Sequence, residues 1–272
     1  MRRPDRPHRL VTEAASPYAE LARWALDLAG VAYQEERHLP TFQAPAALIR
    51  RGGVGPVTLF LADGRILYET VDVVRLADDR TGGMLLARGQ PDRGEVLEWE
   101  AIFTSVLGPA TKRLLYAHLL TNRNLAVRAF GALVPAAERW AWEALHPGLM
   151  LWLERTLPLD AASRAEAEAE VRAVFDRVDE TLAARMPTGA GADLPTRLTR
   201  TGDAPTAADL ALAALASPVL WPPEAEEATR LPIDDLPPAH RDLVGSLRET
   251  RTGRFVLELY RRERRHAGPA GP

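Results

Sequence analysis

The chain has 272 residues, a formal net charge of −3, 46% hydrophobic and 26% charged residues, and no cysteine. These values are ordinary for a soluble globular protein with one large domain or two small ones. They give no electrostatic argument for binding nucleic acid or a membrane surface. Without cysteine, disulfides, zinc–thiolate sites and a cysteine nucleophile are excluded. The six histidines are scattered without metal-ligand spacing, so we expect no metal site.

No segment of the sequence is predicted to enter a membrane. The N-terminal MRRPDRPHRL is basic but lacks the apolar stretch of a secretory signal. The longest apolar run, around residues 210–220, contains Pro218 and is too short to span a bilayer. We therefore expect a cytoplasmic protein.

The first forty residues predict a strand, a helix and a second strand. Residues 9–14, RLVTEA, are typical of a short strand, and Ser16 then provides a favoured N-cap with Pro17 at the first helical position. One helix face is apolar, and Gly30 ends the helix. Residues 31–39, VAYQEERHL, predict a second strand, which a helical crossover makes parallel to the first.

A hairpin and a short helix follow. The segment 41–53 predicts a poor helix or a loop, whereas PVTLFL at 56–61 and RILYE at 65–69 predict two strands around the favoured turn Asp63-Gly64. TVDVVRLADD at 70–79 predicts a helix. The first 80 residues therefore follow a βαβ-ββα order.

The pattern changes to helices only after residues 80–94, whose four glycines and one proline indicate a linker. The segment 95–120 predicts a long helix that is interrupted near Gly108-Pro109. Ser163 and Glu166 have the spacing of a capping box at the start of another helix.

Two more helices are predicted toward the end of the chain. Thr206 and Asp209 form a second box-like start, and the helix behind them is apolar all round, as expected of a buried central helix. The segment TGRFVLELYRRERR predicts a terminal helix whose arginines suit the helix dipole.

Three stretches, in this order, resemble the glutathione S-transferase superfamily: Ser16-Pro17-Tyr18 with ARWALDLAG behind it, GPVTLFLADGRILYET, and PTAADLALAALASP. The resemblance covers roughly residues 8 to 265. It implies an α+β fold, in which an N-terminal thioredoxin-like βαβ-ββα domain (8–82) and a linker (83–92) precede an all-α helical bundle domain (93–265) and a disordered tail (266–272). It also implies a homodimer.

The resemblance implies that glutathione is the co-substrate and that Ser16 faces its thiol. Only the thiolate attacks electrophiles, and a hydroxyl at a helix N-terminus can stabilise that anion. Ser16 can equally be a simple helix cap, and Thr12 or Tyr18 can be the donor instead. The sequence leaves these alternatives open.

Five residues carry the rest of the implied glutathione site. Pro56 is expected to form a cis peptide bond with Gly55, so that the backbone of Gly55 or Val57 pairs with the cysteinyl backbone of glutathione. The Glu69 carboxylate is expected to hold the γ-glutamyl ammonium, and Thr70 at a helix start its carboxylate. The alternatives are a trans proline at a strand start, a helix-capping Thr70 and a solvated Glu69.

The second substrate is expected between the domains. Tyr18, Phe103, Leu107 and Tyr116 are candidate lining residues, although ordinary core is the stronger explanation of Phe103, Leu107 and Tyr116. The sequence does not identify the substrate.

The function that the resemblance implies is transfer of glutathione to a small apolar electrophile. Thioltransferase chemistry through a protein–glutathione disulfide is excluded because the chain has no cysteine. Two alternatives remain: a non-catalytic module of the same fold used for binding or assembly, and a transferase or isomerase that uses another low-molecular-weight thiol.

Overall fold

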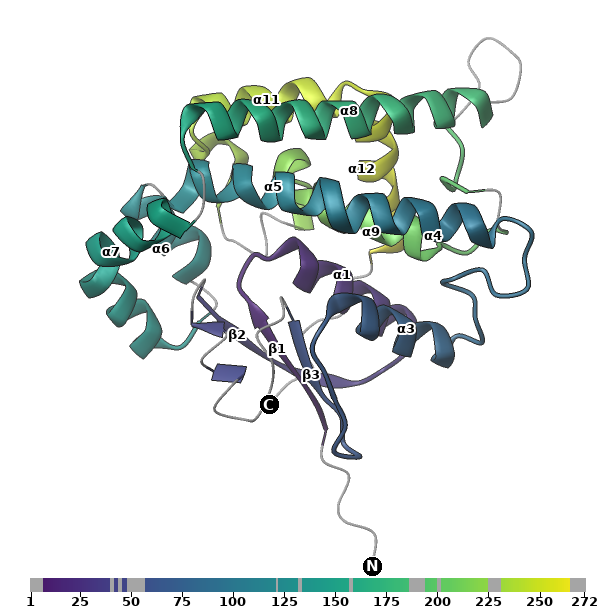
Figure 1. The fold of residues 1–272 in the computed structure, drawn as a ribbon, viewed down its shortest axis with the longest axis horizontal. Helices are drawn as coiled ribbons and strands as arrows, with labels where there is room; N and C mark the ends of the chain where they lie inside the picture. Colours follow the sequence, from purple (N-terminus) through teal and green to yellow (C-terminus); the bar gives the residue numbers. More distant parts are fainter. Residues whose placement is uncertain are drawn as a thin grey trace, which may run out of the picture.

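The computed structural model describes residues 7–39, 42–43, 46–47, 57–120, 122–131, 134–156, 159–185, 194–199, 202–224 and 231–264. A four-stranded sheet lies on one side of the molecule and a stack of helices on the other (Figure 1). Helices α1 and α3 lie between the two parts, so the first helix of the chain contacts both.

The sheet has the strand order β2-β1-β3-β4. Strand β1 (His8–Glu13) pairs in parallel with β2 (Tyr33–His38) and antiparallel with β3 (Val57–Phe60), and β3 pairs antiparallel with β4 (Ile66–Leu67). Gly64 has a φ of +94° in the tight turn between β3 and β4, a conformation that glycine adopts without strain. The predicted crossover and hairpin are both confirmed.

Helix α1 (Pro17–Leu28) begins and ends where its sequence predicts. Ser16 is at the N-cap position with extended backbone angles, and Pro17 opens the helix. Gly30 follows its end with a φ of +63°. Helix α3 (Thr70–Arg80) packs beside α1 and completes the βαβ-ββα order.

The predicted interruption of the long helix takes the form of a π-helical segment. Helix α4 (Arg93–Ile102) continues through π turns over Phe103–Leu107 into α5 (Gly108–Leu115), and a second π segment covers Tyr116–Leu120. The Gly108 N–H donates to the Phe103 carbonyl, five residues back. Since Pro109 has no N–H, the next carbonyl, that of Thr104, accepts instead from the Tyr18 hydroxyl at 2.9 Å.

Six further helices follow among the described residues: α6 (Arg123–Gly131), α7 (Ala136–Thr156), α8 (Ala161–Arg185), α9 (Ala207–Leu220), α11 (Pro238–Arg248) and α12 (Arg251–Glu263). A short 3-10 turn covers Ile233–Asp235. Among the described residues no strand follows β4, so the expected α+β fold with a helical second part is confirmed. Helices α6, α7 and α11 have no counterpart in the sequence prediction.

The expected cap of α8 is wrong. The helix begins at Ala161, and the Ser163 N–H donates to the Asp160 carboxylate at 2.8 Å. Ser163 is therefore a first-turn residue whose N–H is capped, rather than the cap itself. Both residues are favoured caps, and the chain enters the helix three residues before the Ser163 pattern suggests.

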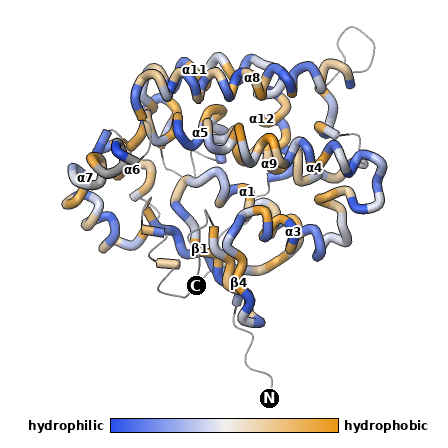
Figure 2. Tube along the Cα trace, viewed as in Figure 1, coloured by the Kyte–Doolittle hydropathy of each residue, from blue (hydrophilic) through white to orange (hydrophobic). Residues whose placement is uncertain are grey.

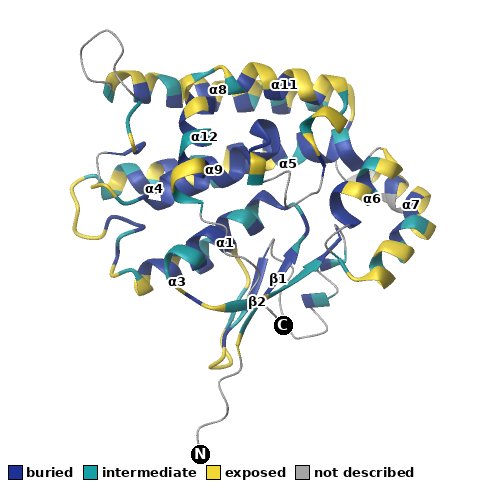
Figure 3. Cartoon of the chain, turned by 180° about the vertical axis from the view of Figure 1, so that it is seen from behind, coloured by how far each residue is buried: buried dark blue, intermediate teal, exposed yellow. Residues whose placement is uncertain are grey.

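Helix α9 is the buried centre of the helical part, as predicted. All 14 of its residues are buried, and Figure 3 shows it dark along its length, while α8 and α11 carry exposed residues on their outer sides. Figure 2 shows the same division as alternating hydrophilic and hydrophobic colour on the outer helices. The Asp209 carboxylate accepts from the Thr206 N–H at 2.8 Å and from the Leu198 N–H at 2.8 Å. The predicted capping box is thus confirmed.

The end of the described chain returns to α1. Arg264, which follows α12, donates to Glu20 and to Asp27 at 2.7 Å each. Its guanidinium lies 5.7 Å from the ring centre of Trp24, which also contacts Tyr260 at 4.9 Å. Helix α1 is therefore fixed by the sheet on one side and by α9 and α12 on the other.

Candidate functional site

Three segments of the expected glutathione site meet at one edge of the sheet. Because β3 runs antiparallel to β1, and β4 antiparallel to β3, the end of β1, the start of β3 and the end of β4 lie at the same edge. Ser16 follows β1, Val57 opens β3, and Glu69 and Thr70 follow β4. The strand topology thus explains how residues more than fifty positions apart in sequence approach one another.

The turn that carries Ser16 is strained. The Ser16 N–H donates to the Glu13 carbonyl at 3.2 Å, and Ala15 between them has a φ of +60°. Left-handed backbone at a residue with a Cβ costs about 1–2 kcal/mol, and such strain is found preferentially at functional sites. The surrounding structure therefore stabilises this turn at some energetic cost.

Ser16 occupies the cap position without forming the cap hydrogen bond. Its side chain makes no hydrogen bond to α1, and its Oγ is buried with no hydrogen-bond partner among the described residues. The residue is 2% exposed. A buried hydroxyl without a partner is costly, so this oxygen is available for a ligand at the positive end of the helix dipole.

The competing hydroxyls are all engaged elsewhere. Thr12 donates to the Glu35 carboxylate at 2.7 Å, and Tyr18 donates to the Thr104 carbonyl. Tyr116, expected only to line the second-substrate pocket, donates to the Glu13 carboxylate in a very short contact. Of the hydroxyl donors that the sequence proposes for the sulfur, Ser16 is thus the one without a protein partner in the described structure.

Glu69 and Thr70 lie at the start of α3. Burial, and then the charge of Glu69, raise the pKa of Tyr18 in the first turn of α1 to about 12. Glu69 is exposed at the N-cap of α3, whereas Thr70 is buried and its Oγ1 has no partner among the described residues. Val57 is buried at the start of β3. Gly55 and Pro56, and with them the expected cis bond, lie outside the described residues.

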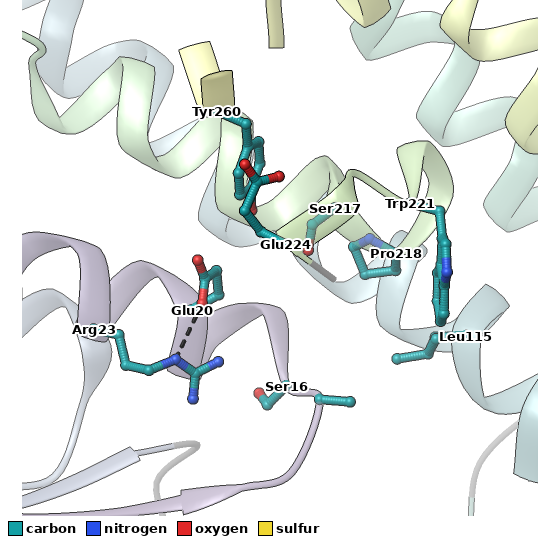
Figure 4. Close-up of a pocket in the computed structure, with 10 residues that line it drawn as sticks. Ser16, Glu20, Arg23, Leu115, Ser217, Pro218, Trp221, Glu224 and Tyr260 are labelled. Carbon is teal, nitrogen blue, oxygen red and sulfur yellow. Dashed lines mark hydrogen bonds and ion pairs between the residues drawn. The ribbon is translucent and has the colours of Figure 1, made fainter. Parts of the chain in front are cut away.

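A cavity of about 40 Å³ lies beside Ser16, between α1 and the ends of α9 and α12 (Figure 4). This volume holds a few water molecules. On the α1 side it is lined by Ser16, Glu20 and Arg23, which follow one another at helical spacing. On the other side it is lined by residues that no sequence motif indicates, among them Leu115, Ser217, Pro218, Trp221, Glu224 and Tyr260.

The charges on the α1 side of this cavity are mutually neutralised. Burial would raise the pKa of Glu20, but Arg23 and Arg264 hold it below its usual range. Arg23 also contacts Glu35 at 2.7 Å. Burial would likewise raise the pKa of Glu35, yet Arg23 and Arg37 lower it to about 2. These carboxylates remain ionised and paired with arginines at neutral pH.

The four residues expected to line the second-substrate pocket lie elsewhere. Phe103 and Leu107 are fully buried in the core that α8 and α9 share. Tyr18 bridges α1 to Thr104, and Tyr116, at the start of the second π segment, bridges to Glu13 of β1. None of the four lines the cavity beside Ser16. Of the residues that do line this cavity, Ser16, Glu20 and Arg23 have helical spacing, which is the one sequence signal that could have indicated its α1 side.

Comparison with known proteins agrees with this fold. Residues 10–84 match the family model of the glutathione S-transferase N-terminal domain. No curated protein sequence matches the chain. Glutathione S-transferase-I bound with lactoylglutathione shares the fold at 16% identity and a TM-score of 0.52, over 93% of this chain and 100% of that one.

Two further structures give the same result. A glutathione transferase from Pseudomonas putida, with one glutathione disulfide bound per subunit, is 14% identical with a TM-score of 0.54, over 96% of this chain and 90% of that one. A glutathione transferase from Populus trichocarpa is 12% identical with a TM-score of 0.51, over 92% and 98% of the two chains. At these identities the likeness extends to the fold.

The architecture is therefore that of a thioredoxin-like domain followed by a helical domain, with a candidate ligand site at the start of the first helix. Residues 10–84 thus match the glutathione S-transferase N-terminal domain, and the chain shares its overall fold with glutathione transferases of known structure. Within the described residues, no helix is long and apolar enough to cross a membrane, and no group of three or more candidate ligand side chains is placed to hold a metal ion.

Proposed function

We propose that the protein binds glutathione at the edge of the sheet and transfers it to a small electrophile. The observation that carries the proposal is the Ser16 hydroxyl, buried at the start of α1 without a hydrogen-bond partner among the described residues. An O–H donor at a helix N-terminus stabilises a thiolate and lowers the pKa of the thiol.

In this proposal the other expected residues orient the co-substrate. The Glu69 carboxylate holds the γ-glutamyl ammonium, and Thr70 with the first N–H groups of α3 holds the carboxylate beside it. The backbone at Gly55, Pro56 and Val57 pairs with the cysteinyl unit. The thiolate then attacks the electrophile, a carbon–sulfur bond forms, and the leaving group departs with its electron pair. A homodimer is part of the proposal through the family likeness alone.

The test compares Ser16→Ala with the wild type. A true N-cap costs about 0.5–2 kcal/mol when replaced by alanine. Since Ser16 makes no cap hydrogen bond, we expect its replacement to cost less than about 0.5 kcal/mol of unfolding free energy. If the hydroxyl stabilises the thiolate, we expect a raised pKa of bound glutathione and turnover lowered by as much as about a hundredfold.

Thr250→Ala is the matched control. Thr250 caps α12, where its hydroxyl oxygen accepts from the Gly253 N–H at 2.9 Å, so this variant should lose stability and keep the thiolate titration. The titration is followed by the absorbance of the bound thiolate against pH. Superimposed curves for wild type and Ser16→Ala would remove Ser16 from the chemistry. A wild type whose melting temperature does not respond to glutathione would favour the non-catalytic module.

A further inference from the structure

The cavity beside Ser16 has a second polar group without a partner. Glu224 lines it from the segment after α9, and its Oε2 is buried with no hydrogen-bond partner among the described residues. Figure 4 shows Glu224 with Ser217 and Tyr260 on the side opposite Ser16 and Glu20. The cavity is therefore lined on one side by Ser16 and on the other by Glu224, and each contributes a buried oxygen without a hydrogen-bond partner among the described residues.

The charges around the cavity decide which ligand fits. Arg23, the cation in its lining, is already paired with Glu20 at 3.0 Å and with Glu35 at 2.7 Å. Glu224 is the lining carboxylate for which the described residues provide no ion pair. Among the described residues an anionic group would meet no free cation here, whereas a positively charged hydrogen-bond donor would satisfy Glu224.

The size and the remaining walls restrict the ligand further. About 40 Å³ is room for roughly three water molecules, which suits an ammonium group with a short alkyl stem. Leu115, Pro218 and Trp221 provide apolar contact for such a stem. An ammonium group has three donors, enough to reach Glu224 and the Ser16 oxygen from within the cavity.

We propose that this cavity binds the ammonium group of a small cationic electrophile, with Glu224 as its counter-ion. The inference rests on the proposed transferase function, and it replaces the apolar second substrate that the family resemblance implies. The reacting carbon then lies next to the ammonium group, close to the sulfur that Ser16 stabilises.

The first measurement tests binding without glutathione. Propylammonium chloride is compared with sodium chloride at equal ionic strength and with neutral 1-propanol, and the melting temperature is followed. We expect propylammonium alone to raise the melting temperature of the wild type, because a ligand that binds only the folded state stabilises it. No response of the wild type to propylammonium beyond that to sodium chloride would overturn the ammonium site.

The second measurement uses a matched pair of electrophiles, 2-bromoethylammonium and 1-bromopropane, in which an ammonium group replaces a methyl group. In each reaction the glutathione thiolate attacks the carbon that carries bromine, a C–S bond forms, and the C–Br bond breaks with release of bromide. The thiol proton goes to solvent. Each enzymatic rate is divided by the uncatalysed rate, which removes the difference in intrinsic reactivity.

We expect the wild type to prefer the ammonium compound, and Glu224→Gln to lower that preference at least about tenfold, as loss of a charge-assisted hydrogen bond does. Glu180→Gln, an exposed exchange of the same kind on α8, should keep the preference. Equal rates of both electrophiles in the wild type, or a preference that survives in Glu224→Gln, would refute the role of Glu224.

The two proposals fail in different ways. If propylammonium stabilises the wild type but neither electrophile is conjugated, the ammonium site is supported and the transferase function is overturned. If conjugation proceeds without a response to propylammonium, the transferase function is supported and the ammonium site is overturned. The comparison of propylammonium with sodium chloride and 1-propanol on the wild type tests the ammonium site even if Glu224→Gln does not fold.

Discussion

Replacing Gly108 with alanine tests how α1 and the long helix fit together. Gly108 opens α5 directly against Tyr18 of α1: a Cβ at this position would lie 2.5 Å from the Tyr18 hydroxyl oxygen and 2.8 Å from its Cζ. The residue also has helical angles (φ −60°, ψ −48°) immediately before Pro109, which a Cβ disfavours. We therefore expect Gly108→Ala to destabilise the protein although alanine is the better helix former.

The expected magnitude is a difference between two effects. Alanine in place of glycine favours a helix by about 0.5–1 kcal/mol. Overpacking a tight site costs about 1–3 kcal/mol, and displacing Tyr18 from the Thr104 carbonyl removes a hydrogen bond worth about 0.5–1.5 kcal/mol. The balance is a loss of about 1–3 kcal/mol of unfolding free energy.

The assay is urea unfolding followed by circular dichroism, with Gly245→Ala as the control. Gly245 lies inside α11, and a Cβ there meets nothing within 4 Å, so this variant gains helix propensity without a clash and should be more stable than the wild type. The Tyr18→Phe variant lacks the hydroxyl oxygen, which is the closest atom, but keeps the ring. In that background Gly108→Ala should therefore lower the unfolding free energy by a smaller amount, but still lower it. A Gly108→Ala protein as stable as Gly245→Ala would refute the close contact.

Two further predictions concern the strained turn at Ala15 and the buried His240. Ala15→Gly should be neutral or stabilise the protein by up to about 1 kcal/mol, because glycine adopts a φ of +60° without strain. As a control, Ala19→Gly inside α1 should cost about 1 kcal/mol of unfolding free energy. Equal losses of stability in thermal unfolding of the two variants would show that Ala15 is not strained. His240, fully buried 4.8 Å from the His118 ring, has its pKa lowered to about 4 by burial and by His118, against about 6.5 in the unfolded chain. Between these two pH values His240 is protonated in the unfolded state but not in the folded state. The free energy of unfolding should therefore fall by up to about 3 kcal/mol as the pH drops from about 6.5 to about 4. His240→Gln should flatten that part of the pH–stability curve, and an unchanged slope would show that other groups cause it.

The sequence determined the elements whose signals span only a few residues. Ser16-Pro17 sets the start of α1, Asp63-Gly64 the hairpin, and Thr206 with Asp209 the start of the buried helix. Each depends on backbone geometry within one turn, which adjacent residues control. The order of these elements was then sufficient to indicate the fold class.

Even local signals were ambiguous where two residues compete for the same role. Asp160 and Ser163 are both good caps, and the structure uses Asp160. Helix α7 carries Pro147 within it, and its exposed side includes Trp140, Leu145 and Leu151, so its sequence lacks a clean polar face. Only packing against the rest of the fold decided where such helices form.

Only the tertiary structure decided the surroundings of the Ser16 hydroxyl. Whether this hydroxyl caps α1 depends on the orientation of the side chain. Whether Thr12 and Tyr18 compete with it depends on their own partners, the Glu35 carboxylate and the Thr104 carbonyl. The cavity beside it adds Glu224 and Tyr260, more than two hundred residues away in the sequence. Sequence periodicity reports only which residues share a face of one helix or strand. The contacts around the cavity arise instead because α1 is buried between the sheet and α9, which brings polar groups that are distant in sequence into one small space where each needs a hydrogen-bond partner.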